Sequence, residues 1–305
     1  MKYLMHLVML GSINAIAVCG VTLLIGFTGM FSLGHAGFMA IGAYAAAFLC
    51  KTTGLNYLLC ILFGALFSML IGMLFGYPTI KNRLTGDYFA IVMMGFGEAV
   101  RIFIANEYKY LNGAMGYQKI PKHTTLALVL ILLVALVYCM ASFIKSQHGR
   151  NCIAIREDEY AAEVLGINAI KTKMMALMIS GFYCGIAGAL YGFYMGALYP
   201  QVFSGTMSND FTAAIVIGGM GSLSGPLFAG FFLPWLPEVA RFFSEWRLVF
   251  YGLAFVLIML FRPEGLYGYK EFSIKRTVKN IRLFPAKVKG LFSKRAKRDD
   301  SGGKE

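Results

Sequence analysis

The sequence predicts an all-α protein, a polytopic bundle of transmembrane helices built from about eight apolar segments. Of its 305 residues, 58% are hydrophobic and only 14% are charged, and the mean hydropathy is +0.66. A soluble domain would need far more polar surface than this. Two glycine-rich stretches, residues 26–37 and 219–228, interrupt the apolar pattern. Lipid offers no hydrogen-bond partners to the backbone N–H and C=O groups of a non-helical segment. We therefore expect both stretches to be broken or re-entrant segments that are buried in protein or line a cavity.

The first apolar segment, residues 4–27, leads into the first glycine-rich stretch. A removable signal peptide is the alternative for this segment, but its apolar core is too long and no clean cleavage site follows. His35 lies within the glycine-rich stretch. A histidine in such a place is either a hydrogen-bonded packing residue or part of a proton relay, and packing is the commoner role.

The next apolar segments are residues 57–77, which we expect to end at Pro78, and a segment that carries Glu98 and Arg101. Glu98 and Arg101 are three residues apart, so they share one face of a helix and can neutralise each other. Without a partner, each charge would cost about 2.5–3.5 kcal/mol at the middle of the bilayer. The pattern leaves open whether this pair is structural or faces a substrate.

The middle of the chain alternates polar loops with further apolar segments. Residues 106–124 form a polar loop that we place on the outer face, and residues 126–144 then cross back. The segment 174–199 carries glycines at helical spacing, which let helix backbones approach closely, so we expect it deep in the bundle. Residues 200–210 form a second outer loop, and residues 248–261 form the last span.

The longest charged stretch between apolar segments is residues 149–168, called the charged segment below. Ala161, Ala162 and Leu165 are at helical spacing, so the sequence predicts a short amphipathic helix at the membrane surface. Gly166 is placed to end this helix, because glycine tolerates the left-handed conformation. An exposed helix with small side chains is a surface that another protein can bind. The alternative is an ordinary solvent-exposed helix in a loop, without a partner.

The two glycine-rich stretches resemble each other. Residues 29–33 match residues 219–223 at four positions, and Phe38 matches Phe228 at the same offset. This match predicts an internal repeat whose two halves have the same orientation in the membrane. The N-terminus then lies outside the cell, or inside it if the first stretch is re-entrant. No lysine followed by serine or threonine completes a Walker pattern in the chain, so we expect no ATP hydrolysis by this polypeptide.

Positive charge is concentrated at the C-terminal end. The net charge is +13, and from Arg262 onward there are thirteen Lys and Arg against five Asp and Glu. We divide the chain into a transmembrane domain, residues 1–262, and a basic, disordered cytoplasmic tail, residues 263–305. We expect membrane lipid headgroups, rather than nucleic acid, as partners of the tail. The six cysteines are scattered without metal or disulfide spacing, so we expect neither a metal nor another cofactor.

Four stretches carry a family resemblance: residues 28–44, 83–98, 149–168 and 216–226. In this order they resemble the permease subunits of ABC importers for branched-chain amino acids, most closely the LivM-type half. The resemblance implies a permease domain over residues 1–262, a location in the plasma (inner) membrane of a prokaryote, and a cytoplasmic C-terminus. It also implies a transport subunit that is not itself an enzyme.

The resemblance further implies several partners. A sister permease of the LivH type completes the translocation path, two ABC ATPase subunits of the LivG/LivF type hydrolyse ATP, and an extracytoplasmic amino-acid-binding protein delivers the substrate. Permeases for urea and short amides share these motifs and are the alternative within the class. An ion-coupled secondary transporter with His35, Asp87 and Glu98 as a relay would leave the charged segment without a role, and the motifs of an intramembrane enzyme are missing.

In that family the charged segment is a coupling helix that docks on the ATPase. General ABC importers carry the pattern Glu-Ala-Ala-x-x-x-Gly there, and here Tyr160 stands in place of the glutamate. The residues that we assign to ATPase coupling on this resemblance are Arg156, Glu157, Glu159, Ala161, Ala162 and Gly166. The candidates for the translocation path, where irregular backbone and helix ends can meet a carboxylate, are Ser32, Gly34, His35, Glu98, Gly219, Gly221 and Ser222.

Overall fold

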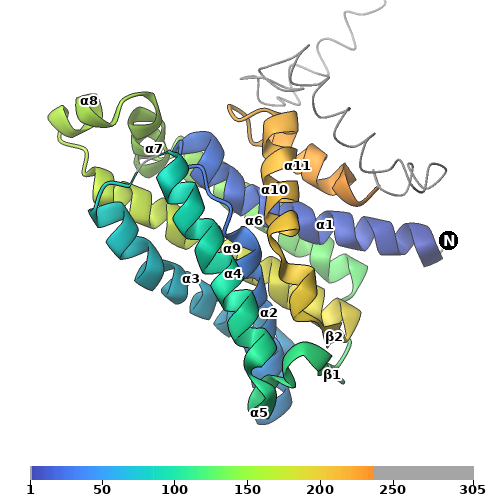
Figure 1. Ribbon diagram of the computed structural model, residues 1–305. Helices are drawn as coiled ribbons and strands as arrows, with labels where there is room; N and C mark the ends of the chain where they lie inside the picture. Colours follow the sequence, from blue (N-terminus) through green and yellow to red (C-terminus); the bar gives the residue numbers. More distant parts are fainter. Residues whose placement is uncertain (1, 85, 236–305) are drawn as a thin grey trace, which may run out of the picture. The chain divides into compact units, whose positions relative to one another are not determined.

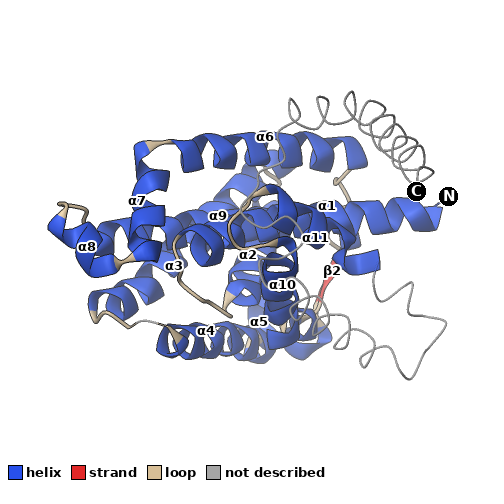
Figure 2. Ribbon diagram, turned by 90° about the horizontal axis from the view of Figure 1, so that it is seen from above, coloured by secondary structure: helices blue, strands red, loops and turns tan. Residues whose placement is uncertain are grey.

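The computed structural model describes residues 2–84 and 86–235, and these residues form eleven α-helices (Figure 1). The only β-strands in this part of the chain are two strands of two residues each, which pair with each other (Figure 2). The predicted last span, residues 248–261, and the basic tail, residues 263–305, lie outside the described residues. The prediction of an all-α, polytopic membrane protein is confirmed.

The elements follow one another with short connections. In chain order they are α1 (Lys2–Thr22), a π-helical turn (Leu23–Phe27), α2 (His35–Thr53), α3 (Tyr57–Lys81), α4 (Asp87–Asn106), α5 (Tyr108–Leu111), β1 (Tyr117–Gln118), α6 (Leu126–Lys145), α7 (Gln147–Glu157), α8 (Glu159–Val164), α9 (Ala169–Met195), β2 (Ala197–Leu198), α10 (Gly205–Gly218) and α11 (Ser224–Phe232). Short 3-10 turns cover Gly113–Met115, Pro200–Phe203 and Leu233–Trp235.

Six helical segments of the described residues are long and apolar enough to cross a membrane: α1 with its π-helical turn, α2, α3, α4, α6 and α9. Each contains 19 to 27 residues, and about 20 residues at a rise of 1.5 Å per residue span the hydrocarbon core. Helices α10 and α11, with 14 and 9 residues, are individually shorter than this. The second glycine-rich stretch separates them, as the sequence predicts.

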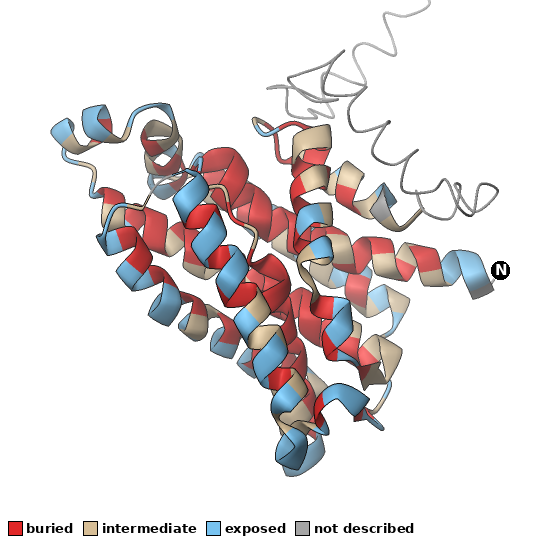
Figure 3. Ribbon diagram, viewed as in Figure 1, coloured by how far each residue is buried: buried red, intermediate tan, exposed pale blue. Residues whose placement is uncertain are grey.

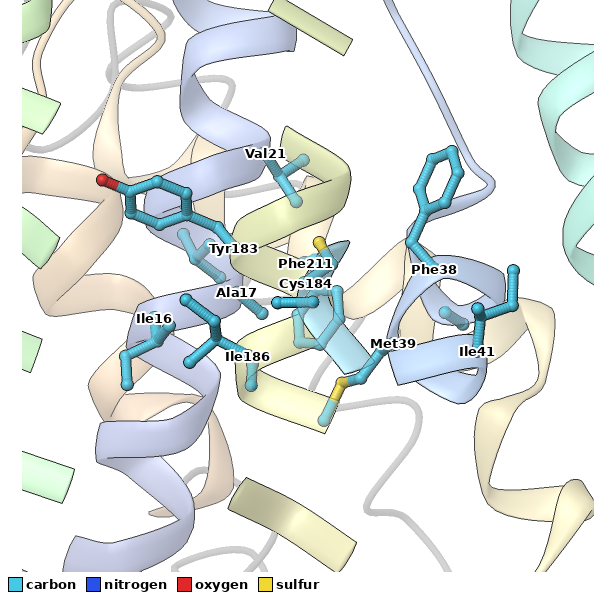
Figure 4. Packing of buried hydrophobic residues seen from close by; sticks show 14 of the residues in the cluster. Ile16, Ala17, Val21, Phe38, Met39, Ile41, Tyr183, Cys184, Ile186 and Phe211 are labelled. Carbon is cyan, nitrogen blue, oxygen red and sulfur yellow. The ribbon is translucent and has the colours of Figure 1, made fainter. Parts of the chain in front are cut away.

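Helix α9 is packed against α1, α2 and α3 and is buried over most of its length (Figure 3). Its Tyr183, Cys184 and Ile186 lie among side chains of α1 and α2 in the hydrophobic core (Figure 4). Gly185 lies so close to α3 that a Cβ added there would be 2.8 Å from the Cα of Ala65. The glycine spacing of this helix therefore permits close helix packing, as predicted.

Helix α3 ends later than the sequence predicts. Instead of ending at Pro78, the helix runs through this residue to Lys81. Proline lacks the N–H that would donate to the carbonyl four residues earlier, but helical hydrogen bonding continues beyond it, because the N–H of Asn82 donates to the carbonyl of Pro78 at 3.2 Å. There the Thr79 hydroxyl donates to the carbonyl of Gly76 at 2.7 Å, so the end of the helix has other polar contacts.

The boundaries of α9 and α10 also differ from the prediction. Helix α9 begins at Ala169, because the Asn168 side chain accepts a hydrogen bond from the backbone N–H of Lys171 at 2.9 Å and caps the helix. Helix α10 begins at Gly205, so the second half of the loop predicted at 200–210 is helical. Both helices start before their continuous apolar runs, which begin at Met174 and Phe211, and apolar patterning does not detect mixed first turns.

The two predicted outer loops lie at the same end of the bundle. Strands β1 and β2 pair antiparallel, with Tyr117 opposite Leu198. Helix α9 has 27 residues, about 40 Å, and separates this end from the charged segment, which precedes α9 (Figure 1). Near the β1–β2 end, His6 of α1 hydrogen-bonds the Tyr194 hydroxyl of α9 at 2.6 Å. Helix α1 therefore runs from the β1–β2 end towards the charged segment.

Candidate functional site

The charged segment contains two helices, α7 and α8, where the sequence predicts one. Asp158 lies between them with an extended backbone. Its Oδ1 accepts hydrogen bonds from the backbone N–H groups of Tyr160 and Ala161 at 2.9 and 3.0 Å, so Asp158 is the N-cap of α8. The short helix predicted around Ala161 and Ala162 is α8, whereas α7 was not predicted.

Gly166 ends α8, as predicted. Its φ is +85°, in the left-handed region. The N–H of Gly166 donates to the carbonyl of Glu163 at 2.9 Å, and the N–H of Ile167 donates to the carbonyl of Ala162 at 3.0 Å. These two bonds form a Schellman motif, which satisfies the last carbonyls of the helix and turns the chain back towards the membrane domain.

Two ion pairs attach α8 to neighbouring elements. Lys173 of α9 donates from Nζ to Glu159 Oε2 at 2.6 Å, and the lysine is almost completely buried. Arg83, which follows α3, pairs with Glu163 at 3.2 Å in a more exposed position. The buried pair is screened less by solvent and so holds α8 more firmly than the exposed one.

The two alanines assigned to coupling face in different directions. Ala161 is exposed, whereas Ala162 is buried against Ile155 of α7 and Ala169 of α9. Ala162 therefore contributes to the small core that joins α7, α8 and α9, and its side chain is covered by the protein itself. A larger side chain at this position would act through that packing.

Three large apolar side chains project from α8 into solvent. Tyr160, Val164 and Leu165 are 75%, 87% and 80% exposed. An apolar patch rimmed by charged residues marks an interaction surface. Val164 was not singled out from the sequence, although an apolar pair inside a charged stretch is a signal for such a surface.

Arg156 connects the charged segment to the first glycine-rich stretch. Its Nη1 donates to the carbonyl oxygen of Gly26 at 2.8 Å, and its Nη2 contacts Glu157 Oε1 at 2.5 Å. Gly29 has a φ of +72°, and a Cβ added there would lie 2.9 Å from Arg156 Cγ. Glycine is thus required at this position both by the backbone conformation and by the arginine stem.

The two glycine-rich stretches have similar backbones. The first is non-helical over residues 28–34 and the second over residues 219–223. Gly29 and Gly219, which are equivalent in the repeat, both have positive φ, +72° and +108°. Ser32 and Ser222, also equivalent, are both completely buried. The short sequence match therefore coincides, in each half, with a break in the helix, a positive-φ glycine and a buried serine.

The two stretches also touch each other. A Cβ added to Gly26 would lie 2.7 Å from the carbonyl oxygen of Met220. Gly221 in the second stretch is half-buried, and the Ser222 hydroxyl lies 3.5 Å from the carbonyl oxygen of Gly219. Because the two stretches are closely packed, a displacement of the first stretch would also displace the second.

Gly34 and His35 are packed tightly inside the protein, whereas residues that line an open path would be exposed to it. A Cβ added to Gly34 would lie 3.0 Å from the carbonyl carbon of Met93, so this glycine lets α2 and α4 cross closely. His35 is completely buried near Phe38, and neither ring nitrogen has a hydrogen-bond partner among the described residues. Packing was the expected role of His35, but the expected hydrogen bond is missing.

Replacing Gly34 by alanine is expected to lower the stability of the purified protein by about 1–3 kcal/mol, the usual cost of overpacking. The matched control is Gly95→Ala on α4, where an added Cβ meets nothing within 4 Å. Thermal unfolding in detergent, followed by circular dichroism, measures the difference. Equal midpoints for the two variants would contradict the close crossing of α2 and α4.

Glu98 and Arg101 form the ion pair that the sequence predicts. Arg101 donates to Glu98 Oε1 from Nε at 2.9 Å and also from Nη2. Both side chains are partly exposed. In this arrangement each charge is neutralised by its neighbour on the same helix.

The charged-segment end of the bundle has little reactive chemistry. Burial raises the pKa of the Cys152 thiol on α7, while a hydrogen bond to Thr28 acts in the opposite direction. The thiol is therefore protonated and unreactive at neutral pH. Within residues 2–84 and 86–235, no three His, Cys, Asp or Glu side chains lie close enough together to hold a metal ion.

Comparison with known proteins decides the family. Residues 3–260 match the family described as branched-chain amino acid transport system / permease component. The chain belongs to this family. The resemblance to LivM-type permeases is confirmed, and the six apolar spans fit a multi-pass membrane protein.

Individual relatives are consistent with this assignment. The high-affinity branched-chain amino acid transport system permease proteins LivM of Salmonella typhimurium and of Escherichia coli are each 34% identical over 281 residues. These alignments cover 81% of this chain and 66% of each LivM protein, so the chain spans slightly less than two thirds of their length. The permease protein LivH of E. coli is 25% identical over 87% of this chain and 94% of LivH. No solved structure matches the chain.

Proposed function

We propose that this chain is the transmembrane permease subunit of an ATP-driven importer for branched-chain amino acids. It forms half of the translocation path, and a LivH-type permease forms the other half. Two LivG/LivF-type ATPases bind the charged segment on the cytoplasmic side, and an extracytoplasmic binding protein delivers the amino acid. Family membership supports the transporter class. The observation that carries the coupling role is the hydrogen bond from Arg156 to Gly26, which joins the charged segment to the π-helical turn just before the non-helical residues 28–34.

In this proposal the ATPases contact α8 and move it when they bind ATP. The exposed Tyr160, Val164 and Leu165 provide the apolar contact with the ATPase. The buried ion pair between Glu159 and Lys173 transmits the movement of α8 to α9. A two-state bundle switches only if ATP binding favours one packing over the other, and these contacts supply the difference.

The movement then reaches the glycine-rich stretches. Arg156 connects α7 to the end of the π-helical turn, and this turn lies against the second stretch at Met220. The N-terminus of α2 follows the first stretch, where the backbone N–H of Ala36 donates to the Ser208 hydroxyl of α10 at 2.9 Å. A rearrangement here would release a positive helix end and the unpartnered His35 ring, both suited to a substrate carboxylate.

The test of the function is uptake of radiolabelled L-leucine by proteoliposomes that contain the complete transporter. We expect uptake to require ATP and the binding protein, and to persist after an ionophore dissipates ion gradients. Uptake that continues without ATP but stops with the ionophore would instead identify an ion-coupled transporter. Competition by urea or acetamide, without competition by valine or isoleucine, would identify the amide-permease alternative.

A further inference from the structure

A cavity of about 160 Å³ lies where the charged segment meets the first glycine-rich stretch and the loop before α4. It is distinct from the residues assigned above to the translocation path, none of which lines it. The sequence gives no indication of it, because its walls come from four separate parts of the chain. Two of these walls contain glycines with positive φ, Gly29 and Gly86.

One part of the wall is apolar. Met30 follows Gly29 in the first glycine-rich stretch. Leu84 lies in the loop before α4, Phe89 lies in the first turn of α4, and Ile155 lies on α7. Met30, Phe89 and Ile155 are buried. The volume of about 160 Å³ leaves room for a small aliphatic group, since a cavity of roughly 150 Å³ can hold benzene. An isobutyl or sec-butyl side chain is of this size or smaller.

The other part of the wall carries charges of both signs. Lys173 is only 7% exposed, and its Nζ lies 2.6 Å from Glu159 Oε2. The Arg156 side chain is 22% exposed and lines the same cavity. In the absence of a ligand these charges are paired within the protein, which keeps them in place without a buried unpaired charge.

We propose that this cavity binds a zwitterionic amino acid with a short branched side chain. The lysine and arginine match a carboxylate, the glutamate matches an ammonium group, and the apolar wall matches the aliphatic side chain. Inorganic phosphate would leave the apolar wall unused and would meet the negative charge of Glu159. A divalent cation would meet the two positive charges of Arg156 and Lys173.

Occupation of the cavity would regulate transport. This step rests on the proposed function, in which the charged segment is cytoplasmic and the transported molecule is of the same chemical class as the ligand. A ligand that bridges Arg156, Glu159 and Lys173 stabilises the present arrangement of α7, α8 and α9. It therefore opposes the movement that ATP binding drives, by linkage between the two sites. Imported amino acid that accumulates inside would slow its own import.

The experiment uses the complete transporter in proteoliposomes with the ATPases facing outward and with the binding protein and L-leucine enclosed. L-Leucine is then added to the ATPase side, and ATP-driven export of enclosed label is measured. We expect at least a fivefold loss of rate at saturating leucine. Leucinol, which lacks the carboxylate, and 4-methylvalerate, which lacks the ammonium group, should require at least tenfold higher concentrations, and phosphate should have no effect.

Variants separate the cavity from the translocation path. Lys173→Gln removes the ion pair to Glu159 and should therefore lower the uninhibited rate. It should also raise, at least tenfold, the leucine concentration that halves the rate remaining in this variant. Leu84→Phe, which fills the cavity and leaves the ion pair intact, should do the same. The matched control is the double variant Arg83→Gln, Glu163→Gln, which removes the exposed ion pair of the same segment and should retain the inhibition.

Several results would overturn the proposal. Inhibition that is unchanged in both Lys173→Gln and Leu84→Phe would place the leucine site elsewhere, and equal inhibition by phosphate would identify a simple anion site. Transport of leucine without any inhibition from the ATPase side would reject the regulatory cavity and leave the proposed function intact. If the wild-type complex transports no leucine at all, the proposed function itself fails.

Discussion

Replacing Arg156 by alanine is expected to reduce amino-acid uptake about 10- to 100-fold while ATP hydrolysis continues. The variant loses the hydrogen bond from Nη1 to the carbonyl of Gly26, which measures 2.8 Å. A hydrogen bond from a charged group contributes about 1.5–3 kcal/mol, and each 1.4 kcal/mol corresponds to about a factor of ten. The guanidinium is 22% exposed, so solvent weakens this interaction only in part. Loss of the bond leaves α7 and α8 able to follow the ATPases without moving the first glycine-rich stretch.

The measurement is the ratio of amino acid transported to ATP hydrolysed in proteoliposomes. Arg150→Ala is the matched control, because Arg150 lies on the same helix and its Nη1 donates only to the nearby carbonyl of Lys145, at 2.9 Å. Arg156→Lys keeps the charge but cannot reproduce the planar geometry of the guanidinium, so an intermediate ratio is expected. A ratio that stays at the wild-type value in Arg156→Ala, or falls equally in Arg150→Ala, would refute the role of the connection.

Much of this arrangement follows from local sequence patterns. Apolar segment length predicts the spans, because the bilayer imposes a minimum number of residues on each helix. Glycine density predicts both interruptions, and the spacing of Glu98 and Arg101 predicts their ion pair. Gly166 is predictable as a helix end because only a residue without a Cβ adopts its φ of +85° without strain.

The contacts that make a site are less predictable. Arg156 and Gly26 are 130 residues apart, and no periodicity in either segment relates them. The cavity beside Lys173 depends on walls from four parts of the chain, so its existence is a property of the packing alone. His35 illustrates the same limit: its residue type suggests a hydrogen bond, but the folded surroundings offer none among the described residues.

Replacing Leu165 by lysine is expected to weaken binding of the ATPases about 30- to 1000-fold. Leu165 is 80% exposed beside Val164, which is 87% exposed, so neither side chain contributes to the core of this chain. Lysine both removes the apolar contact and brings a charge into it, so we expect a loss of about 2–4 kcal/mol, as at an interface hot spot, which converts to the stated change in affinity. Lysine is chosen because a positive charge at the C-terminal end of α8 is favourable for the helix. The variant should therefore fold and insert normally.

The matched control is Met115→Lys, which places the same charge on an equally exposed apolar residue at the β1–β2 end of the bundle. Co-purification of the ATPases with the tagged permease measures binding, and the amount of permease in the membrane measures folding. If α8 contacts the ATPases, Leu165→Lys loses them and Met115→Lys retains them, at equal membrane abundance. Retention by both variants would show that the exposed apolar surface of α8 has another partner. Loss by Met115→Lys alone would place the ATPases at the β1–β2 end and reverse the orientation of the whole chain, because α9 separates these two surfaces by about 40 Å.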